Sequence, residues 1–158
     1  MTAARRIATA AQRNCRHAAR RARPVQTVHV LVALCGSSVL LQRRPPQGIW
    51  GGLMCLPQFE TPSALKRAAR ALGCSGAALE VLPPRRHELT HLSLAIEPYR
   101  LRLEGTAGKA RSARDHDTAA QRWFTPKAAE EAGMPVPHRR LLEEAACTDA
   151  SRARAKSR

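Results

Sequence analysis

Residues 43–60 constrain the fold of this chain more than any other segment. They hold three of its glycines, three of its prolines and one of its two tryptophans. Glycine permits positive φ angles and close approach of other segments, while proline fixes the direction in which the chain enters and leaves. The segment therefore predicts a loop with a defined shape between two strands, the kind of loop that often carries function. We expect its structural residues to be Gly48, Trp50, Gly51 and Gly52.

The residues on either side of this loop predict a β-hairpin and a helix. Residues 25–34 form an almost continuous apolar run, as in a strand buried on both faces, and residues 39–42 supply the returning strand. Thr61 is placed to cap a helix that has Pro62 at its first position and ends before Gly73. The apolar stripe of this helix recurs at helical spacing.

Further strands and helices follow along the chain. Residues 78–82 and 121–124 predict short strands, and residues 126–132 and 137–146 predict helices. Between them, apolar residues alternate over 92–103 and the alternation changes phase at Pro98, which predicts two half-buried strands or one bent strand. Pro98 marks a sheet edge or a kink. We expect 105–117 to be a loop. The order of elements indicates one mixed α/β sandwich over residues 25–147.

Positive charge is concentrated at the two ends of the chain. The net charge is +15, with 27 Lys and Arg against 12 Asp and Glu. Residues 1–24 contain seven arginines and no acid, so we expect a basic arm, disordered or partly helical, and a second basic disordered tail at 148–158. Such ends suit phosphate backbones, although they also fit plain disordered termini. No apolar run is long enough to span a membrane, and five cysteines, an odd number without a CxxC pair, fit a reducing, cytoplasmic setting.

The hairpin, glycine loop and helix together resemble a Nudix domain. Its signature is Gly, five residues, Glu, seven residues, Arg-Glu, an apolar residue, any residue, Glu-Glu, any residue, Gly. With Gly52 as the first glycine, Gln58 stands at the first glutamate, and Lys66, Arg67 and Arg70 stand near or at the later ones. The resemblance implies an α+β, Nudix-like α/β/α sandwich with a degenerate Nudix box.

The charge on the helix argues against Nudix hydrolysis. Divalent cations take oxygen ligands, and three cations at spacings of three and four residues repel a metal ion. We therefore predict no catalytic residue and no metal site. The basic side chains Arg43, Arg44, Lys66, Arg67 and Arg70 are candidate phosphate contacts, although the three on the helix also fit a solvated face.

A narrower resemblance covers residues 28 to about 145. The string RRPPQGIWGGLMCLPQFE at 43–60 is similar to the Q-R-P-x-x-G-L-W-G-G-L-W-x-F-P-x-F-E stretch in the C-terminal domain of adenine DNA glycosylases of the MutY family. Residues 86–91, RHELTH, resemble the H-x-F-S-H loop of that domain. Trp123-Phe124, the segment 133–137 and Leu141-Leu142 resemble its closing W-[FY], G-[LM]-P-x-P and L-L motifs.

The MutY resemblance implies a module that reads 8-oxoguanine opposite adenine during base excision repair. By carry-over, Thr90 reads the lesion, His91 contacts base or phosphate, Leu89 is an apolar wedge and Arg86 belongs to the same site. The implied partner is double-stranded DNA that contains 8-oxoguanine, with a separate glycosylase catalytic domain and a bacterial, nucleoid-associated location. The family's helical catalytic domain and the four cysteines of its 4Fe-4S cluster have no counterpart here, so we expect this chain alone to be inactive and free of cofactors.

Two other functions remain open. A Nudix-type hydrolase of oxidised nucleoside triphosphates could take carboxylates from outside the box, such as Glu60, Glu88 or Glu97. A non-specific basic nucleic-acid-binding protein would need only the charged ends.

Overall fold

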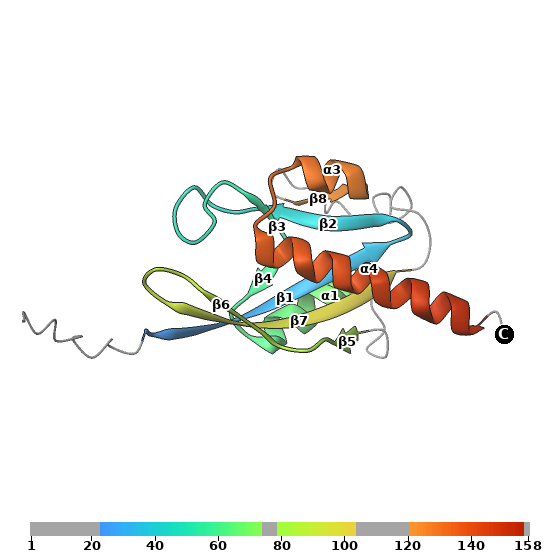
Figure 1. Ribbon diagram of the computed structural model, residues 1–158, viewed down its shortest axis with the longest axis horizontal. Helices are drawn as coiled ribbons and strands as arrows, with labels where there is room; N and C mark the ends of the chain where they lie inside the picture. The colour runs from blue at the N-terminus through green and yellow to red at the C-terminus, as the bar shows by residue number, and fades with distance from the viewer. Residues whose placement is uncertain (1–22, 74–78, 104–120, 157–158) are drawn as a thin grey trace, which may run out of the picture.

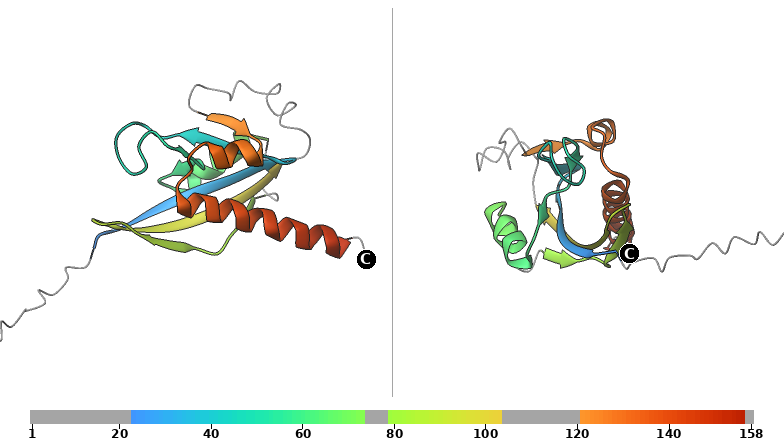
Figure 2. Two further views of the ribbon diagram at one scale, coloured as in Figure 1. Left: turned by 45° about the horizontal axis from the view of Figure 1, so that its top comes forward. Right: turned by 90° about the vertical axis from the view of Figure 1, so that its left-hand side faces the viewer.

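A computed structural model describes residues 23–73, 79–103 and 121–156, and the side chains of these ranges up to residue 146. A mixed β-sheet forms the middle layer, with helix α1 on one face and helix α4 on the other (Figures 1 and 2). This arrangement is the expected α/β/α sandwich. The expected loop at 105–117 and nearly all of the N-terminal basic arm lie outside the described residues.

Strand β1 (Val25–Cys35) lies at the centre of the sheet. It turns into antiparallel β2 (Ser38–Arg43) and pairs in parallel with β7 (Ser93–Leu103) along its whole length. Outside these lie β3 (Met54–Cys55), β4 (Gln58–Phe59), β5 (Leu79–Val81), β6 (Arg85–Glu88) and β8 (Gln121–Phe124). The central part of β1 is buried on both faces, as its continuous apolar run predicts.

Helix α1 (Pro62–Ala71) begins and ends where the sequence predicts. The Thr61 hydroxyl accepts a hydrogen bond from the Ala64 N–H at 3.2 Å, and Pro62 occupies the first turn. Gly73 takes a φ of 102° just past the end of the helix. Leu65 and Ala69 bury the apolar face of α1 against the sheet.

Strand β7 runs without a break through Pro98, so of the two roles predicted for this residue, a sheet edge or a kink, the sheet edge is wrong. Pro98 pairs with Val30 of β1 on one side, and its carbonyl accepts the Leu82 N–H at 2.9 Å on the other. The registers of β5 and β6 on β7 differ by one residue, so 82–84 form a bulge opposite Pro98. The missing N–H of Pro98 therefore faces an interruption of the ladder, where no partner is lost.

Arg100 lies between the apolar residues Tyr99 and Leu101, and this alternation predicts a side chain in solvent, but the structure buries it. Its side chain is only 3% exposed. The guanidinium donates to the Glu80 carboxylate from Nη2 at 2.5 Å and from Nε at 3.1 Å, and Nη1 donates to the Ala145 carbonyl at 3.0 Å. Burial is tolerated because both a carboxylate and a helix carbonyl accept its donors.

The end of the chain also differs from expectation. Helix α3 (Pro126–Glu131) is capped by Thr125, and α4 (Val136–Lys156) continues for ten residues beyond Ala146. It therefore occupies most of the segment expected to be a disordered tail. Residues 145–156 are rich in Ala, Arg and Lys and contain neither Gly nor Pro, so they have high helix propensity. None of the helices in the described ranges is long and apolar enough to cross a membrane.

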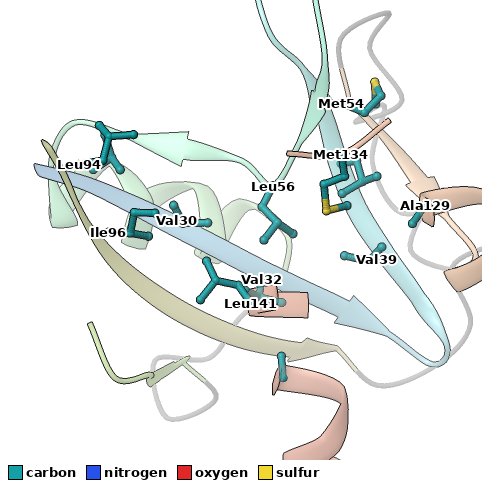
Figure 3. Close-up of a cluster of buried hydrophobic side chains, with 13 residues drawn as sticks. Val30, Val32, Val39, Met54, Leu56, Leu94, Ile96, Ala129, Met134 and Leu141 are labelled. Carbon is teal, nitrogen blue, oxygen red and sulfur yellow. The ribbon is translucent and has the colours of Figure 1, made fainter. Parts of the chain in front are cut away.

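Two apolar clusters fill the space on either side of the sheet. The larger one, whose buried residues are drawn in Figure 3, packs Val30, Val32 and Ile96 of the sheet against Met134 and Leu141. The smaller one packs Leu31, Leu40 and Leu101 against Leu65 and Ala69 of α1. Because each face is covered by a different helix, the sheet presents its loops and hairpins at its ends.

Candidate nucleic-acid interface

The predicted reader residues occupy the tip of the hairpin between β6 and β7. The Leu89 N–H donates to the Leu92 carbonyl at 2.8 Å, which continues the β6–β7 register and leaves Thr90 and His91 as the two residues of the turn. Both residues are exposed, and the hairpin projects from one end of the sheet (Figure 1). The Thr90 hydroxyl and the His91 ring are therefore accessible to a large partner.

Leu89 and Arg86 lie on the same hairpin in different settings. Leu89 is half-buried and packs against the larger core cluster, so it anchors the turn. Insertion of Leu89 into a base stack, the wedge role expected from the sequence, would require it to leave this packing. Arg86 is exposed on β6, where it faces Ala95 of β7.

The proline and glycine loop, residues 43–53, is held by its own backbone. The Gly52 N–H reaches the carbonyls of Arg44 at 3.3 Å and Pro45 at 3.1 Å, and the Arg44 N–H donates to the Leu53 carbonyl at 2.9 Å. Gly48 and Gly52 take positive φ angles. Position 51 requires glycine because there is no room for a side chain: a Cβ atom there would lie 2.2 Å from the Pro46 carbonyl oxygen.

Trp50 connects this loop to two other elements. Its φ of 58° is unusual for a bulky residue and is the single positive φ found outside glycine in the described ranges. The indole meets the His138 ring of α4 edge-on, with centroids 4.8 Å apart, and lies 6.0 Å from the His87 ring of β6. A strained backbone persists only where surrounding contacts hold it, and here two histidines supply them.

His138 is the site residue that sequence reasoning missed. It is fully buried; its Nδ1 accepts the Leu56 N–H at 3.0 Å, and its Nε2 lies 3.1 Å from the Gln58 side-chain amide. Burial, with smaller effects of Arg44 and His87, lowers the pKa of His138 to about 3, so the ring is neutral. The sequence did contain a signal for its burial, because His138 stands three residues before Leu141 and seven before Ala145, on the same apolar face of the helix.

The neutral ring fixes the orientation of Gln58. Since Nδ1 accepts a hydrogen bond, the proton lies on Nε2 and requires an acceptor. The structure places Gln58 Nε2, itself a donor, 3.1 Å from this N–H, so a hydrogen bond here requires the amide turned by 180°, with Oε1 accepting from His138. Position 58, where the Nudix signature has its first glutamate, is thus tied to α4.

A cavity of about 460 Å³ opens between the loop and the base of the hairpin. Its wall includes Trp50, Gln58, Phe59, Leu92 and Leu94. Arg44 also lines it, and its buried Nε has no hydrogen-bond partner. Arg44, expected to be a phosphate contact at the surface, is thus half-buried and turned partly inward. Arg44 also affects the buried Cys55 thiol. Burial raises the pKa of this thiol to about 11, and the positive charge of Arg44 partly opposes that rise.

The remaining basic candidates do not all lie together. Arg43 is exposed at the start of the loop. Lys66, Arg67 and Arg70 are exposed on α1, which covers the opposite face of the sheet from α4 (Figure 2). Within the described ranges, no three His, Cys, Asp or Glu side chains come close enough to hold a metal ion.

Comparison with known proteins matches residues 29–144 to the NUDIX domain family. The chain belongs to the Nudix family. The match covers the sheet, α1 and the first part of α4, so it includes the loop, the hairpin and His138.

Solved structures share this Nudix fold. The C-terminal domain of mouse MUTYH, in complex with human PCNA, is 20% identical with a TM-score of 0.58, over 79% of this chain and 89% of that one. NrtR of Shewanella oneidensis, complexed with a 27mer DNA, is 16% identical with a TM-score of 0.57, over 75% of this chain and 58% of its own length. The NUDIX domain of Shewanella oneidensis NrtR complexed with ADP ribose is 14% identical with a TM-score of 0.54, over 76% of this chain and 85% of that one.

Proposed function

We propose that this Nudix domain is a lesion-recognition module of the adenine DNA glycosylase type, which reads 8-oxoguanine opposite adenine in duplex DNA. The observation that carries the proposal is the turn between β6 and β7. Thr90 and His91 are exposed in this turn, and Leu89, directly before it, packs against the larger core cluster and holds the hairpin in place. The likeness in fold to the MUTYH domain and to a DNA-bound NrtR supports DNA as the partner.

The chemistry of the turn suits the lesion. Guanine presents an acceptor at N7 in the major groove, whereas 8-oxoguanine carries a hydrogen there. A hydroxyl oxygen can accept that hydrogen, and Thr90 offers one at an exposed position. His91 lies beside it, and exposed Arg86 and Arg43 are the basic side chains we assign to phosphate contacts. Excision of the adenine would come from a separate glycosylase catalytic domain.

Thr90→Ala tests this proposal directly. We expect the preference for A:8-oxoguanine over A:G duplexes to fall by roughly 5- to 150-fold, the range of one base-edge contact of about 1–3 kcal/mol. Binding is measured by fluorescence anisotropy with both duplexes in the same salt. Thr90→Ser should keep the preference, and Thr27→Ala, at another exposed threonine, should leave it unchanged. An unaltered preference in Thr90→Ala would remove Thr90 as the reader.

The cavity beside Trp50 supports a second candidate, a hydrolase of oxidised nucleoside triphosphates. Its lining combines aromatic rings with Arg44, and Glu60 adds a carboxylate. Such a lining would suit a planar base and an anionic chain. Mg²⁺-dependent release of pyrophosphate from 8-oxo-dGTP, lost in Glu60→Gln, would establish this activity. Absence of product with the intact chain would exclude it for this substrate.

A further inference from the structure

We infer that Arg23 is a positioning residue for the turn between β6 and β7, and that the preference for 8-oxoguanine depends on it. The inference rests on the proposed reader function and deepens it, because it names the contact that places Thr90. It separates two properties of the site. Selectivity requires a fixed turn, whereas affinity for DNA in general requires only charge.

The turn is not closed by its own backbone. The Leu89 N–H donates to the Leu92 carbonyl at 2.8 Å, but within the described residues no hydrogen bond returns from the Leu92 N–H to the Leu89 carbonyl. Turns without this bond are common, and their ends are held by fewer contacts. The position of Thr90 and His91 therefore depends on another group that holds the Leu89 carbonyl.

Arg23 supplies that group. Its Nη1 donates to the Leu89 carbonyl at 3.0 Å, from a position 66 residues earlier in the chain. The Pro24 carbonyl accepts the N–H of Ser93, the first residue of β7, at 2.9 Å, so the backbone that carries Arg23 is itself tied to the hairpin. The side chain of Arg23 is 31% exposed, which limits the competition of water for its bond to the turn.

Arg23 also pairs with the acid of the hairpin. Glu88 is the one carboxylate within residues 85–94. Arg23 Nη1 lies 3.6 Å from Glu88 Oε2, and the Ser93 hydroxyl donates to the same oxygen. Without a cation beside it, this carboxylate would repel a phosphate backbone. Arg23 therefore acts on both the shape and the charge of the turn.

The two arginines of β6 are placed for other roles. Arg85 donates from Nη2 to the Glu144 carboxylate of α4 at 2.6 Å. Arg86 is exposed and faces Ala95 in the ladder, where it is assigned to a phosphate contact. Of these three arginines, Arg23 is the one whose guanidinium reaches the backbone of the turn.

Three variants of the full chain separate shape from charge. Arg23→Met removes the bond and the positive charge, Glu88→Gln removes the negative charge, and the double variant keeps the net charge of the natural chain. Affinity for A:8-oxoguanine and A:G duplexes is measured by fluorescence anisotropy at one salt concentration. We expect the preference for the lesion to fall by about 5-fold or more in Arg23→Met and in the double variant, because a hydrogen bond from the lesion tolerates little displacement of the Thr90 hydroxyl. Glu88→Gln should bind both duplexes about 2- to 5-fold more tightly and keep the preference.

Two further variants are controls. Arg23→Lys keeps a cationic donor and should recover part of the preference that Arg23→Met loses. Arg122→Met, at the exposed residue of β8, removes one positive charge away from the turn and should leave the preference unchanged.

Nuclear magnetic relaxation of the backbone amides, without DNA, gives a readout that does not depend on the lesion. We expect the order parameters of Thr90 and His91 to fall from about 0.8 in the natural chain to below about 0.6 in Arg23→Met, and to stay high in Glu88→Gln. An unchanged preference in the double variant, or unchanged order parameters in Arg23→Met, would overturn the inference. Equal binding of both duplexes by the natural chain would instead overturn the reader function, and the order parameters would still decide whether Arg23 holds the turn.

Discussion

At the scale of single residues, buried polar side chains position the candidate interface. His138 reaches from α4 to the Leu56 N–H and the Gln58 amide and supports the edge of Trp50. Trp50 in turn holds the loop against β6. The bond to His138 satisfies the buried Leu56 N–H, which would be costly to leave without an acceptor. The loop, the hairpin and α4 are thereby coupled through one neutral imidazole.

The low pKa of His138 predicts a specific acid sensitivity. In the folded chain this pKa is about 3, whereas unfolded histidine titrates near 6.5. Between these values the unfolded state binds more protons, so stability is present at neutral pH and is lost as pH falls. From pH 7 to pH 4 the loss attributable to His138 is about 3 kcal/mol.

His138→Asn provides the comparison, because its side-chain amide can still accept from Leu56 but does not titrate. Urea unfolding is measured at pH 7, 5 and 4. His138→Asn should be less stable than the natural chain at pH 7, and the difference between their free energies of unfolding should become smaller at lower pH. A constant difference across this range would show that His138 has the same pKa in the folded and unfolded chain, and would contradict the lowered pKa.

At the scale of elements, the faces of β7 are set by the helices that cover them. Leu94 and Ile96 face the larger core, whereas Leu101 on the opposite face packs towards α1. The change of phase at Pro98 in the sequence corresponds to this change of face. The bulge at 82–84 lies opposite Pro98, so the missing N–H of Pro98 costs no ladder hydrogen bond. Arg100 then lies on the α4 face, where it joins β5 to the carbonyl of Ala145.

Arg100→Met should reveal the cost of breaking this link between β7, β5 and α4. Arg100→Met removes the donors that Arg100 supplies to the Ala145 carbonyl and the Glu80 carboxylate, and we expect a loss of about 3 kcal/mol. Urea unfolding measures this loss, and Arg122→Met, at the exposed residue of β8, is a control that should change stability by less than about 0.5 kcal/mol. The double variant Arg100→Met/Glu80→Leu should recover much of the loss; no recovery would argue against an unpaired charge as the cause.

At the scale of the whole molecule, a Nudix fold carries cations where the family signature has carboxylates. Arg67 and Arg70 of α1 are exposed, so they can turn into solvent without disturbing the core. The loop and hairpin that we propose as the interface lie at the end of the sheet, supported by the α4 face. The scaffold can thus keep its shape while the charge on α1 changes.

Mg²⁺ should not stabilise the natural chain. A ligand at about 100 times its Kd raises stability by about 2.7 kcal/mol, so a site of 0.1 mM affinity would be evident in 10 mM Mg²⁺ as a rise in Tm of several degrees. The triple variant Arg67→Glu, Arg70→Glu, Ala71→Glu restores carboxylates at exposed positions of α1 and should gain such a rise. A Mg²⁺-dependent rise in Tm of the unaltered chain would contradict the charge argument.

Much of the fold could be predicted from local signals. The cap of α1, the β1–β2 hairpin and the strand at 121–124 all depend on residues close in sequence, and the structure places them as expected. Pro98, Arg100 and the length of α4 could not be predicted in this way. A proline in an interior strand is tolerated only because 82–84 bulge beside it, and a buried arginine only because Glu80 and Ala145 meet it.

The sequence by itself determined where strands, α1 and the shaped loop form, because capping, alternation and glycine requirements act within a few residues. It also determined the charge of α1 and of the arm. Only the tertiary structure decided that Thr90 and His91 lie exposed on a hairpin whose base is buried, that Arg44 turns inward, and that His138 supports Trp50. These placements depend on contacts between residues up to 82 positions apart, which local patterns do not encode.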